Sequence, residues 1–190
     1  MAAVKNNKAN VSAAKGVAGG YVFRAAAGTA LPTDYSTALA EAYKNIGFVG
    51  EDGITFTPSF DVTEHKDMNG DVIDKSLDGA DLEIAMTLVE VKAETLKAQY
   101  GEDNVTDAGG VLTVMDRLQL GEHCVLVFDL LLKNGRKMRR VCPDCEPTEL
   151  GEETVGAGDL FARESKWAAY KDDETGCAKI DYIESTETEA

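Results

Sequence analysis

Long apolar runs are absent from this sequence of 190 residues. The densest run, at residues 124–132, is interrupted by Asp129, and a transmembrane helix needs roughly 20 consecutive apolar residues. The run therefore predicts a buried strand, and we expect no membrane partner. Residues 1–20 contain lysines but no continuous apolar segment, so we expect no secretory signal peptide and folding in a cytoplasm.

Cysteine and histidine are scarce, with four and two residues respectively. Four scattered cysteines are too few for a disulfide framework in a chain of this length, so we expect reduced thiols. Cys142 and Cys145 form one CxxC pair, but a structural zinc site needs a second ligand pair with similar spacing. The pair also ends an expected strand, whereas a redox-active CxxC begins a helix. We therefore expect neither a metal site nor a redox site.

Catalytic and nucleotide-binding motifs are also missing. The sequence contains no GxSxG, HExxH, GxGxxG or phosphate-binding loop. Residues 67–71 place side-chain oxygens in the order of a calcium loop, but Val72 and Asp78 stand where that loop needs glycine and glutamate. We expect a turn at these residues, no cofactor and no enzymatic activity.

Positive charge is the minority sign. The chain has 34 acidic residues against 19 basic ones, a formal net charge of -15 and a pI near 4.5, which disfavours non-specific binding to nucleic acid or anionic membranes. The acidic excess lies in residues 51–190, because residues 1–50 are net basic. Within the acidic part, one dense basic patch stands out, and it includes Arg136, Lys137, Arg139 and Arg140.

Apolar residues make up 44% of the chain and recur along it, which predicts a folded protein. Residues 79–91 alternate between apolar and polar side chains and predict a half-buried strand, with Asp81 and Glu83 on its polar face. Helical spacing predicts helices over residues 35–46 and 92–101. The remaining expected strands share β-prone residues and turn signals, and they lie at residues 19–25, 111–115, 122–132 and 136–143, in a hairpin over 46–60, and in a closing hairpin made of 160–170 and 177–184.

Strands thus dominate, and we expect a mainly β fold, a β-sandwich or partly closed barrel with a flanking α-helix. Residues 160–170 also fit a helix. Residues 1–18 have little hydrophobic pattern and predict a mobile arm before a β domain at 19–184. Residues 61–79 are polar around an Asn69-Gly70 turn and predict a protruding loop or long hairpin. Residues 185–190 form an acidic tail.

One family resemblance covers most of the chain. The stretch GTALPTD…ALAEAYKNIGFVGEDG at residues 28–53, with ETLKAQYGEDNV and the closing AAYKDDETGCAKIDYIE, resembles the major tail protein of long, non-contractile-tailed phages (siphoviruses) or prophages. The resemblance implies a tail tube fold and a structural virion protein that self-assembles into stacked hexameric rings. The rings would form the channel for genome ejection, so the protein would lie in the virion tail, and in the host cytoplasm during assembly.

The resemblance also implies roles for particular residues. An arm between rings would include Lys5, Lys8, Val11 and Lys15. A loop between rings would include Glu64, His65, Lys66, Asp67, Asn69 and Asp71. Asp81 and Glu83 would face the lumen, where carboxylates repel phosphate. Arg136, Lys137, Arg139 and Arg140 would meet acidic surfaces of neighbouring subunits.

The implied partners are other copies of the chain, the tape measure protein, tail-end proteins, and phage DNA that passes without specific binding. Without the resemblance, the same strands would suit a monomeric β-sandwich that binds a carbohydrate or another small ligand. Such a module needs clustered aromatic residues, and Trp167 is the sole tryptophan.

Overall fold

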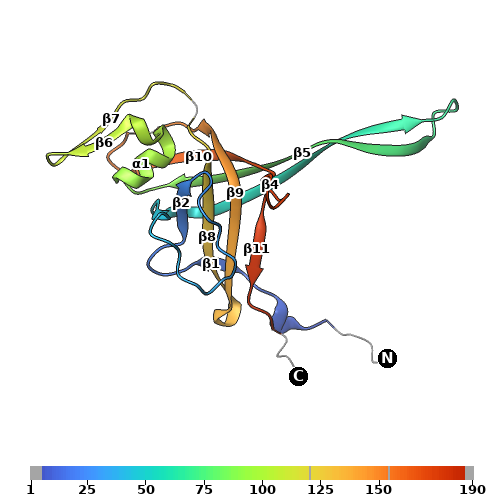
Figure 1. Cartoon of the computed structure of the whole chain (residues 1–190), viewed down its shortest axis with the longest axis horizontal. Helices are drawn as coiled ribbons and strands as arrows, with labels where there is room; N and C mark the ends of the chain where they lie inside the picture. The colour runs from blue at the N-terminus through green and yellow to red at the C-terminus, as the bar shows by residue number, and fades with distance from the viewer. Residues whose placement is uncertain (1–5, 120, 154, 187–190) are drawn as a thin grey trace.

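Antiparallel strands make up most of the regular structure (Figure 1). The computed structural model describes residues 6–119, 121–153 and 155–186. In this part of the chain, nine strands form one sheet in the order β3-β2-β8-β9-β10-β5-β4, with β1 beside β8 and β11 beside β9, while β6 and β7 pair separately. The prediction of a mainly β fold is thus confirmed. The nine strands form one continuous sheet and not the two stacked sheets of a β-sandwich.

The main-sheet strands are β1 (Ala14–Gly16), β2 (Val22–Ala26), β3 (Lys44–Asn45), β4 (Val49–Lys66), β5 (Val72–Leu88), β8 (Cys124–Leu132), β9 (Lys137–Leu150), β10 (Arg163–Tyr170) and β11 (Ile180–Ile183). The small sheet comprises β6 (Val105–Ala108) and β7 (Val111–Val114). The helices are α1 (Ala93–Tyr100) and short 3-10 turns at Lys8–Asn10, Glu102–Asn104 and Lys133–Gly135. No helix among the described residues is long and apolar enough to span a membrane.

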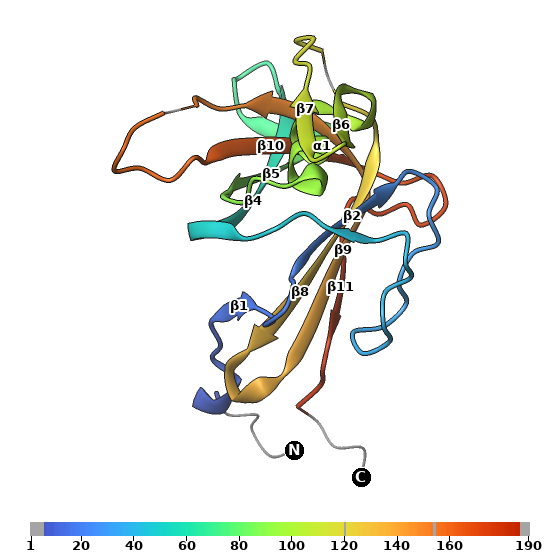
Figure 2. The same cartoon turned by 90° about the vertical axis from the view of Figure 1, so that its left-hand side faces the viewer.

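Strand β9 joins two differently directed parts of the main sheet. Its first half pairs with β8 and β11, and its second half pairs with β10. Figures 1 and 2 show β4, β5 and β10 crossing the direction of β8, β9 and β11 steeply. Bulges in the β8–β9 and β9–β10 pairings accompany this change of direction, as expected because a bulge bends and twists a strand.

The main core lies on the concave side of this bent sheet. Trp167, Phe128 and Ile84 are fully buried there, with Ile46 and Leu88 beside them. The apolar side chains of the strand predicted at residues 79–91 point into this core, as the alternation predicts. Asp81 and Glu83 stay exposed on the other side.

Helix α1 covers one end of the core, in agreement with the expected flanking helix. Ala98 is buried in this core, while Thr95 donates its hydroxyl hydrogen to the carbonyl oxygen of Ile46 at 2.6 Å. The helix ends at Gly101, which has a φ of 93°. Glycine is the usual residue at such a stop because it adopts positive φ without steric cost.

A second, smaller core lies on the opposite side of β8 and β9. Val127 and Val141 are fully buried there, and the irregular loop at residues 27–43 covers them with Leu39 and Tyr43. The part of the sheet built from β8 and β9 is therefore covered on both sides. The part built from β5, β10 and the end of β9 presents an open polar side.

Residues 35–46 do not form the expected helix. Asp34 accepts hydrogen bonds from the backbone N–H groups of Ser36 and Thr37 at 2.5 and 2.6 Å, as an N-cap would. The chain then continues as a loop, and Leu39 packs on the second core. The apolar residues at helical spacing therefore pack on the sheet from an irregular loop, and their spacing does not reflect a helix.

Residues 46–60 do not form the expected hairpin. One long strand, β4, runs through this segment, and its pairing with β5 is interrupted between Val49 and Ile54. The intervening residues bulge, and Gly53 adopts a φ of 76°. Gly53 therefore has the positive φ that the Asp52-Gly53 pair predicts, but it lies in a bulge and not in a hairpin turn.

The end of the chain also differs from the prediction. Strand β9 does not stop at residue 143 but continues to Leu150, through two prolines. The segment expected to be a strand or a helix at 160–170 is strand β10 from Arg163. Strands β10 and β11 do not pair with each other, since β10 lies between β9 and β5 and β11 pairs with β9.

The N-terminal arm is partly fixed to its own domain. Strand β1 pairs with β8 from Gly16 opposite Leu130 to Ala14 opposite Leu132, and the backbone N–H of Lys133 donates to the hydroxyl of Ser12 at 3.0 Å. The predicted mobile arm at residues 1–18 is therefore tied to its own domain between Ser12 and Gly16, and its mobility stays a prediction.

Candidate assembly surfaces

Asp81 and Glu83 lie on an acidic side of the main sheet. Both side chains are exposed on β5, between Leu82 and Ile84, which face the core. Glu83 stands opposite Ala168 of β10 and Thr57 of β4. The two predicted carboxylates therefore share one face with the outward residues of the neighbouring strands.

Other carboxylates extend this face across the neighbouring strands. Glu164 stands on β10 next to β5, and Lys166 on the same strand donates to Glu149 of β9 at 3.0 Å. This hydrogen bond, followed by the charge of Glu149, raises the pKa of Lys166. We call this surface the acidic face, and its carboxylates are Asp81, Glu83, Asp144, Glu146, Glu149 and Glu164.

A histidine and a tyrosine sit at the β9 side of the acidic face. Nδ1 of His123 lies 2.6 Å from an Asp144 oxygen, and its ring stacks on Tyr170 with centroids 5.6 Å apart. The hydrogen bond to Asp144, with the charges of Asp144 and Glu146, raises the pKa of His123. The hydroxyl of Tyr170 donates to Glu146 at 3.0 Å, which together with burial raises the pKa of Tyr170. The largest cause of each shift is a hydrogen bond to a carboxylate of the acidic face.

The residues predicted to form a loop between rings lie at the tip of the β4–β5 hairpin. Glu64, His65 and Lys66 end β4, and the turn follows. In the turn, a carboxylate oxygen of Asp67 accepts hydrogen bonds from the backbone N–H groups of Asn69 and Asp71 at 2.8 and 2.9 Å. These bonds, chiefly the one from Asp71, lower the pKa of Asp67.

The turn is closed by the N–H of Gly70, which donates to the carbonyl oxygen of Asp67 at 3.1 Å, with Gly70 at a φ of 90°. The Asn69-Gly70 turn signal is therefore confirmed. The hairpin projects well beyond the rest of the sheet (Figure 1). Its role between rings stays a prediction.

The predicted arm residues are distributed along the N-terminal segment. Lys5 lies outside the described residues. Lys8 begins a short 3-10 turn, Val11 is 67% exposed, and Lys15 is exposed in β1. The segment that carries them lies beside the β8–β9 turn, below the level of the hairpin in both views (Figures 1 and 2).

The predicted basic patch is not a cluster of exposed cations. Arg140 donates to Asp181 through Nε and Nη2 at 2.6 and 3.0 Å and covers the ring of Phe56. Arg136 donates from Nε and Nη2 to the carbonyl oxygen of Glu184 at 3.0 and 2.6 Å. The hydrogen bonds of both guanidinium groups are therefore made within the chain, and contact with a neighbouring subunit stays a prediction.

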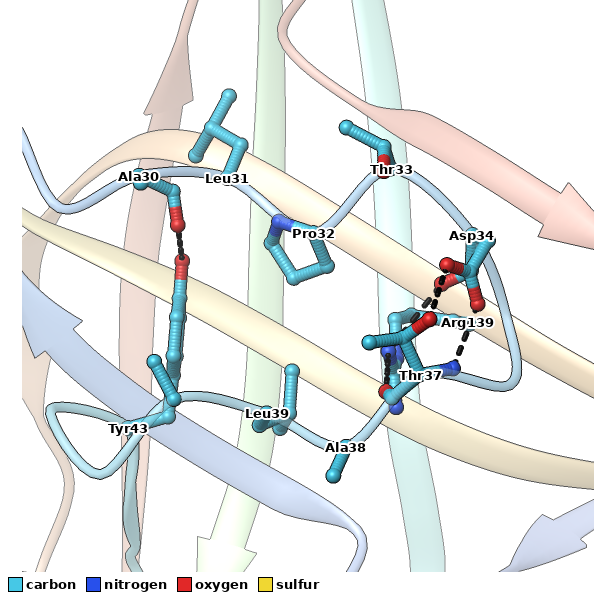
Figure 3. A pocket seen from close by; sticks show the side chains of 11 residues that line it. Ala30, Leu31, Pro32, Thr33, Asp34, Thr37, Ala38, Leu39, Tyr43 and Arg139 are labelled. Carbon is cyan, nitrogen blue, oxygen red and sulfur yellow. Dashed lines mark hydrogen bonds between the residues drawn. The ribbon is translucent and has the colours of Figure 1, made fainter.

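Arg139 is the most buried member of the set, at 4% exposure. It donates to both oxygens of Asp129 on β8, at 2.7 and 2.9 Å, and from Nη1 to the carbonyl oxygens of Asp34 and Thr37 at 3.1 and 2.7 Å. It thus fastens the irregular loop to the sheet (Figure 3). Sequence reasoning missed this role, because the pair becomes visible only once Asp129 and Arg139 face each other across β8 and β9.

The same loop surrounds a pocket of about 230 Å³. Figure 3 shows Leu31, Pro32 and Leu39 on its apolar side and Arg139 at its polar end, while the Tyr43 hydroxyl donates to the carbonyl oxygen of Ala30 at 3.0 Å. Asp34, Thr37, Tyr43 and Arg139 all make hydrogen bonds within the chain. This arrangement favours a structural role for the pocket.

The CxxC cysteines are core residues. Cys142 and Cys145 are fully buried, as is Cys124. Burial raises the pKa of Cys124 to about 11, and the contact with Cys142 followed by burial raises the pKa of Cys145. In the described parts of the chain, no group of histidine, cysteine and acidic residues is arranged to hold a metal ion.

Comparisons with known proteins give one family match. A family model described as phage tail tube protein matches residues 4–141, which is more than half of the chain. No curated protein matches the sequence. Among solved structures, one similar chain comes from an extracellular contractile injection system, the PVC sheath-tube complex in its extended state. It is 12% identical with a TM-score of 0.47, and the match covers 86% of this chain and 88% of that chain.

Proposed function

The chain belongs to the phage tail tube protein family, and we propose that its copies assemble into stacked hexameric rings whose acidic faces line a channel for phage DNA. A member of this family is a structural component of the phage tail and not an enzyme. The resemblance of residues 28–53 supports a long, non-contractile siphovirus tail, with the tape measure protein and tail-end proteins as further partners. Assembly then takes place in the host cytoplasm, and the rings serve genome ejection.

The acidic face is the observation that carries the channel proposal. Carboxylates from β5, β10 and β9 stand on one open side of the sheet, while the other side of the same strands is core. A channel lined by carboxylates repels phosphate, whereas a basic lining would retain DNA by counterion release. Asp81 and Glu83 are at the centre of this proposal.

Assembly is tested first by negative-stain electron microscopy of the purified protein at increasing concentration. Rings or tubes are expected. Protein that remains monomeric at every concentration, even with tail-initiation components, would contradict self-assembly and would return attention to the alternative of a monomeric binding module.

The position of the acidic face is tested on assembled tubes. In the double variant Asp81→Lys with Glu83→Lys, tubes should retain duplex DNA at low salt and protect it from nuclease, whereas wild-type tubes should not. Asp107→Lys, which changes an exposed carboxylate on β6, serves as the control and should give no protection. If the double variant binds DNA that nuclease still degrades, then these side chains lie outside the channel.

A further inference from the structure

Residues 121–123 lead into strand β8 and have no regular structure of their own. The pairing of β8 with β9 begins at Cys124, which stands opposite Cys145, and β9 beyond that point pairs with β10 on its other edge. The three residues therefore run beside β9 without belonging to the ladder. Contacts other than ladder hydrogen bonds must hold them in place.

Both ends of this segment contact β9. The backbone of Gly121 lies against Pro147, because a Cβ added at Gly121 would lie 2.7 Å from Cγ of that proline. Proline has no N–H and donates no hydrogen bond to the segment. At the other end, Nδ1 of His123 lies 2.6 Å from a carboxylate oxygen of Asp144. When the ring is protonated, this hydrogen bond is charge-assisted, and such bonds are roughly twice as strong as neutral ones.

The other neighbours of the His123 ring also favour its protonated form. Nε2 lies 3.8 Å from a carboxylate oxygen of Glu146. The ring stacks on Tyr170 with centroids 5.6 Å apart, a distance at which an aromatic face attracts a cation. The Tyr170 hydroxyl in turn donates to Glu146 at 3.0 Å. The ring thus belongs to one network that includes both carboxylates and the phenol.

The charged and titratable groups around this network come from several elements and are mostly acids. They are Asp144 and Glu146 of β9, Tyr170 of β10, Asp81 of β5, Glu122 of the segment itself and, on the core side beside Cys124, Arg24 of β2. The side chain of His123 is 48% exposed, so burial contributes little to its position. The hold on the segment therefore depends on the charge of the ring.

We propose that His123 is a pH-sensitive clasp, which holds residues 121–123 against β9 and β10 when it is protonated and releases them when it loses its proton to water. The neutral ring keeps one N–H donor for the two carboxylates that flank it. Because its neighbours raise the pKa of His123 above the ordinary value of 6.5, the clasp is closed below about pH 6.5 and opens as the pH rises through the raised pKa.

Opening of the clasp changes the acidic face as well as the segment. Loss of the proton takes one positive charge from the β9 side of this face, where Asp144 and Glu146 then lack that cation. Above the raised pKa, the acidic face of each copy is therefore more negative by one charge. The inference does not depend on the proposed self-assembly, because every group of the clasp belongs to one chain.

Spin labelling of the free chain tests the clasp. In a Cys177→Ser background, which removes the exposed native thiol, a nitroxide label is attached to Glu122→Cys, an exposed position next to the ring. Electron paramagnetic resonance then measures the rotational mobility of the label from about pH 5.5 to about pH 8.5. The mobility should rise by at least about twofold over this range, with a midpoint above pH 6.5.

Variants of the labelled protein identify the titrating group. His123→Gln carries no charge at any pH, so its label should show the high mobility throughout. Asp144→Asn combined with Glu146→Gln removes the partner charges and should also abolish the pH dependence. The chain has two histidines, and His65→Gln, which changes the one at the end of β4, is the matched control. Its label should follow the same pH profile as that of the labelled parent protein.

Two results would overturn the inference. The first is a label mobility that stays constant over the whole pH range in the labelled parent protein. The second is a pH dependence that persists in His123→Gln, because a different group would then control the segment. Circular dichroism checks that each variant keeps its β structure. If a variant fails to fold, the pH profile of the parent protein still decides, since a constant mobility there is sufficient to reject the clasp.

Discussion

Replacing Arg139 with methionine is expected to lower the free energy of unfolding by about 3 kcal/mol. The side chain is 4% exposed, and its guanidinium holds Asp129 with two hydrogen bonds of 2.7 and 2.9 Å. Breaking a buried ion pair by removing one partner costs about 3–5 kcal/mol, because the other charge stays buried without its counterion. The Asp129 side chain keeps 20% exposure, so water reaches it and the lower end of that range applies.

The two loop carbonyls add little to this value. Asp34 and Thr37 lose their guanidinium donor, but both line the pocket in Figure 3, where water can take over the hydrogen bonds. The loop should nevertheless loosen. Faster backbone hydrogen exchange at residues 30–42 is therefore expected in the variant, in excess of any global change.

Urea unfolding of the monomer measures the effect, with the emission of the fully buried Trp167 as the signal. For a chain of this length, about 3 kcal/mol corresponds to a melting temperature lower by roughly 6–12 °C. Lys137→Met, two residues earlier on the same strand and exposed, is the control and should stay within about 0.5 kcal/mol of the wild type.

A double variant separates the ion pair from simple loss of packing. Arg139→Met combined with Asp129→Leu removes both charges, and it should recover most of the stability because apolar residues of similar volume replace buried pairs at little cost. If Arg139→Met alone unfolds within about 0.5 kcal/mol of the wild type, or if the double variant is less stable than the single one, the assignment of Arg139 as a buried clamp is refuted.

Two further predictions concern the acidic face and the arm. His123 should titrate above its ordinary pKa of 6.5. Its attraction to Asp144 and Glu146 therefore stabilises the fold fully below about pH 6.5, and this stabilisation is lost as the pH rises through the folded-state pKa. An NMR titration of His123 measures the pKa, and an unchanged pKa in the Asp144→Asn variant would contradict the prediction. Gly16→Ala should lower the melting temperature by several degrees, since an added Cβ would lie 2.4 Å from Cγ of Tyr21. Scanning calorimetry measures the melting temperature. An unchanged value would show that the Tyr21 ring moves aside without loss of stability.

The elements that rest on local chemistry could be predicted from the sequence. The strand with Asp81 on its polar face follows from strict alternation, and the Asn69-Gly70 turn follows from the positive φ that glycine accepts. The end of α1 at Gly101 has the same origin. In each of these cases, a few neighbouring residues contain all the physical information that decides the local structure.

The elements that rest on register could not be predicted. Gly53 supplies a positive φ both in a turn and in a bulge, and only the partner strand decides between them. Arg139 belongs to a run of basic residues that is typical of a solvated surface, and its burial follows from the pairing of β8 with β9. The wider acidic face has the same cause, because Glu146 and Glu164 are distant in sequence and share one face only through the pairing of β9 with β10.

Strand β5 carries both the protruding hairpin and the middle of the acidic face. It pairs with β10 from Leu82 to Leu88 and with β4 along almost its whole length. A pull on the hairpin along its strands therefore loads many backbone hydrogen bonds at once, because these bonds lie across the strand direction. In a polymer, tension between subunits would be shared by the sheet as a shear load, and Asp81 and Glu83 would move with the strand that bears it.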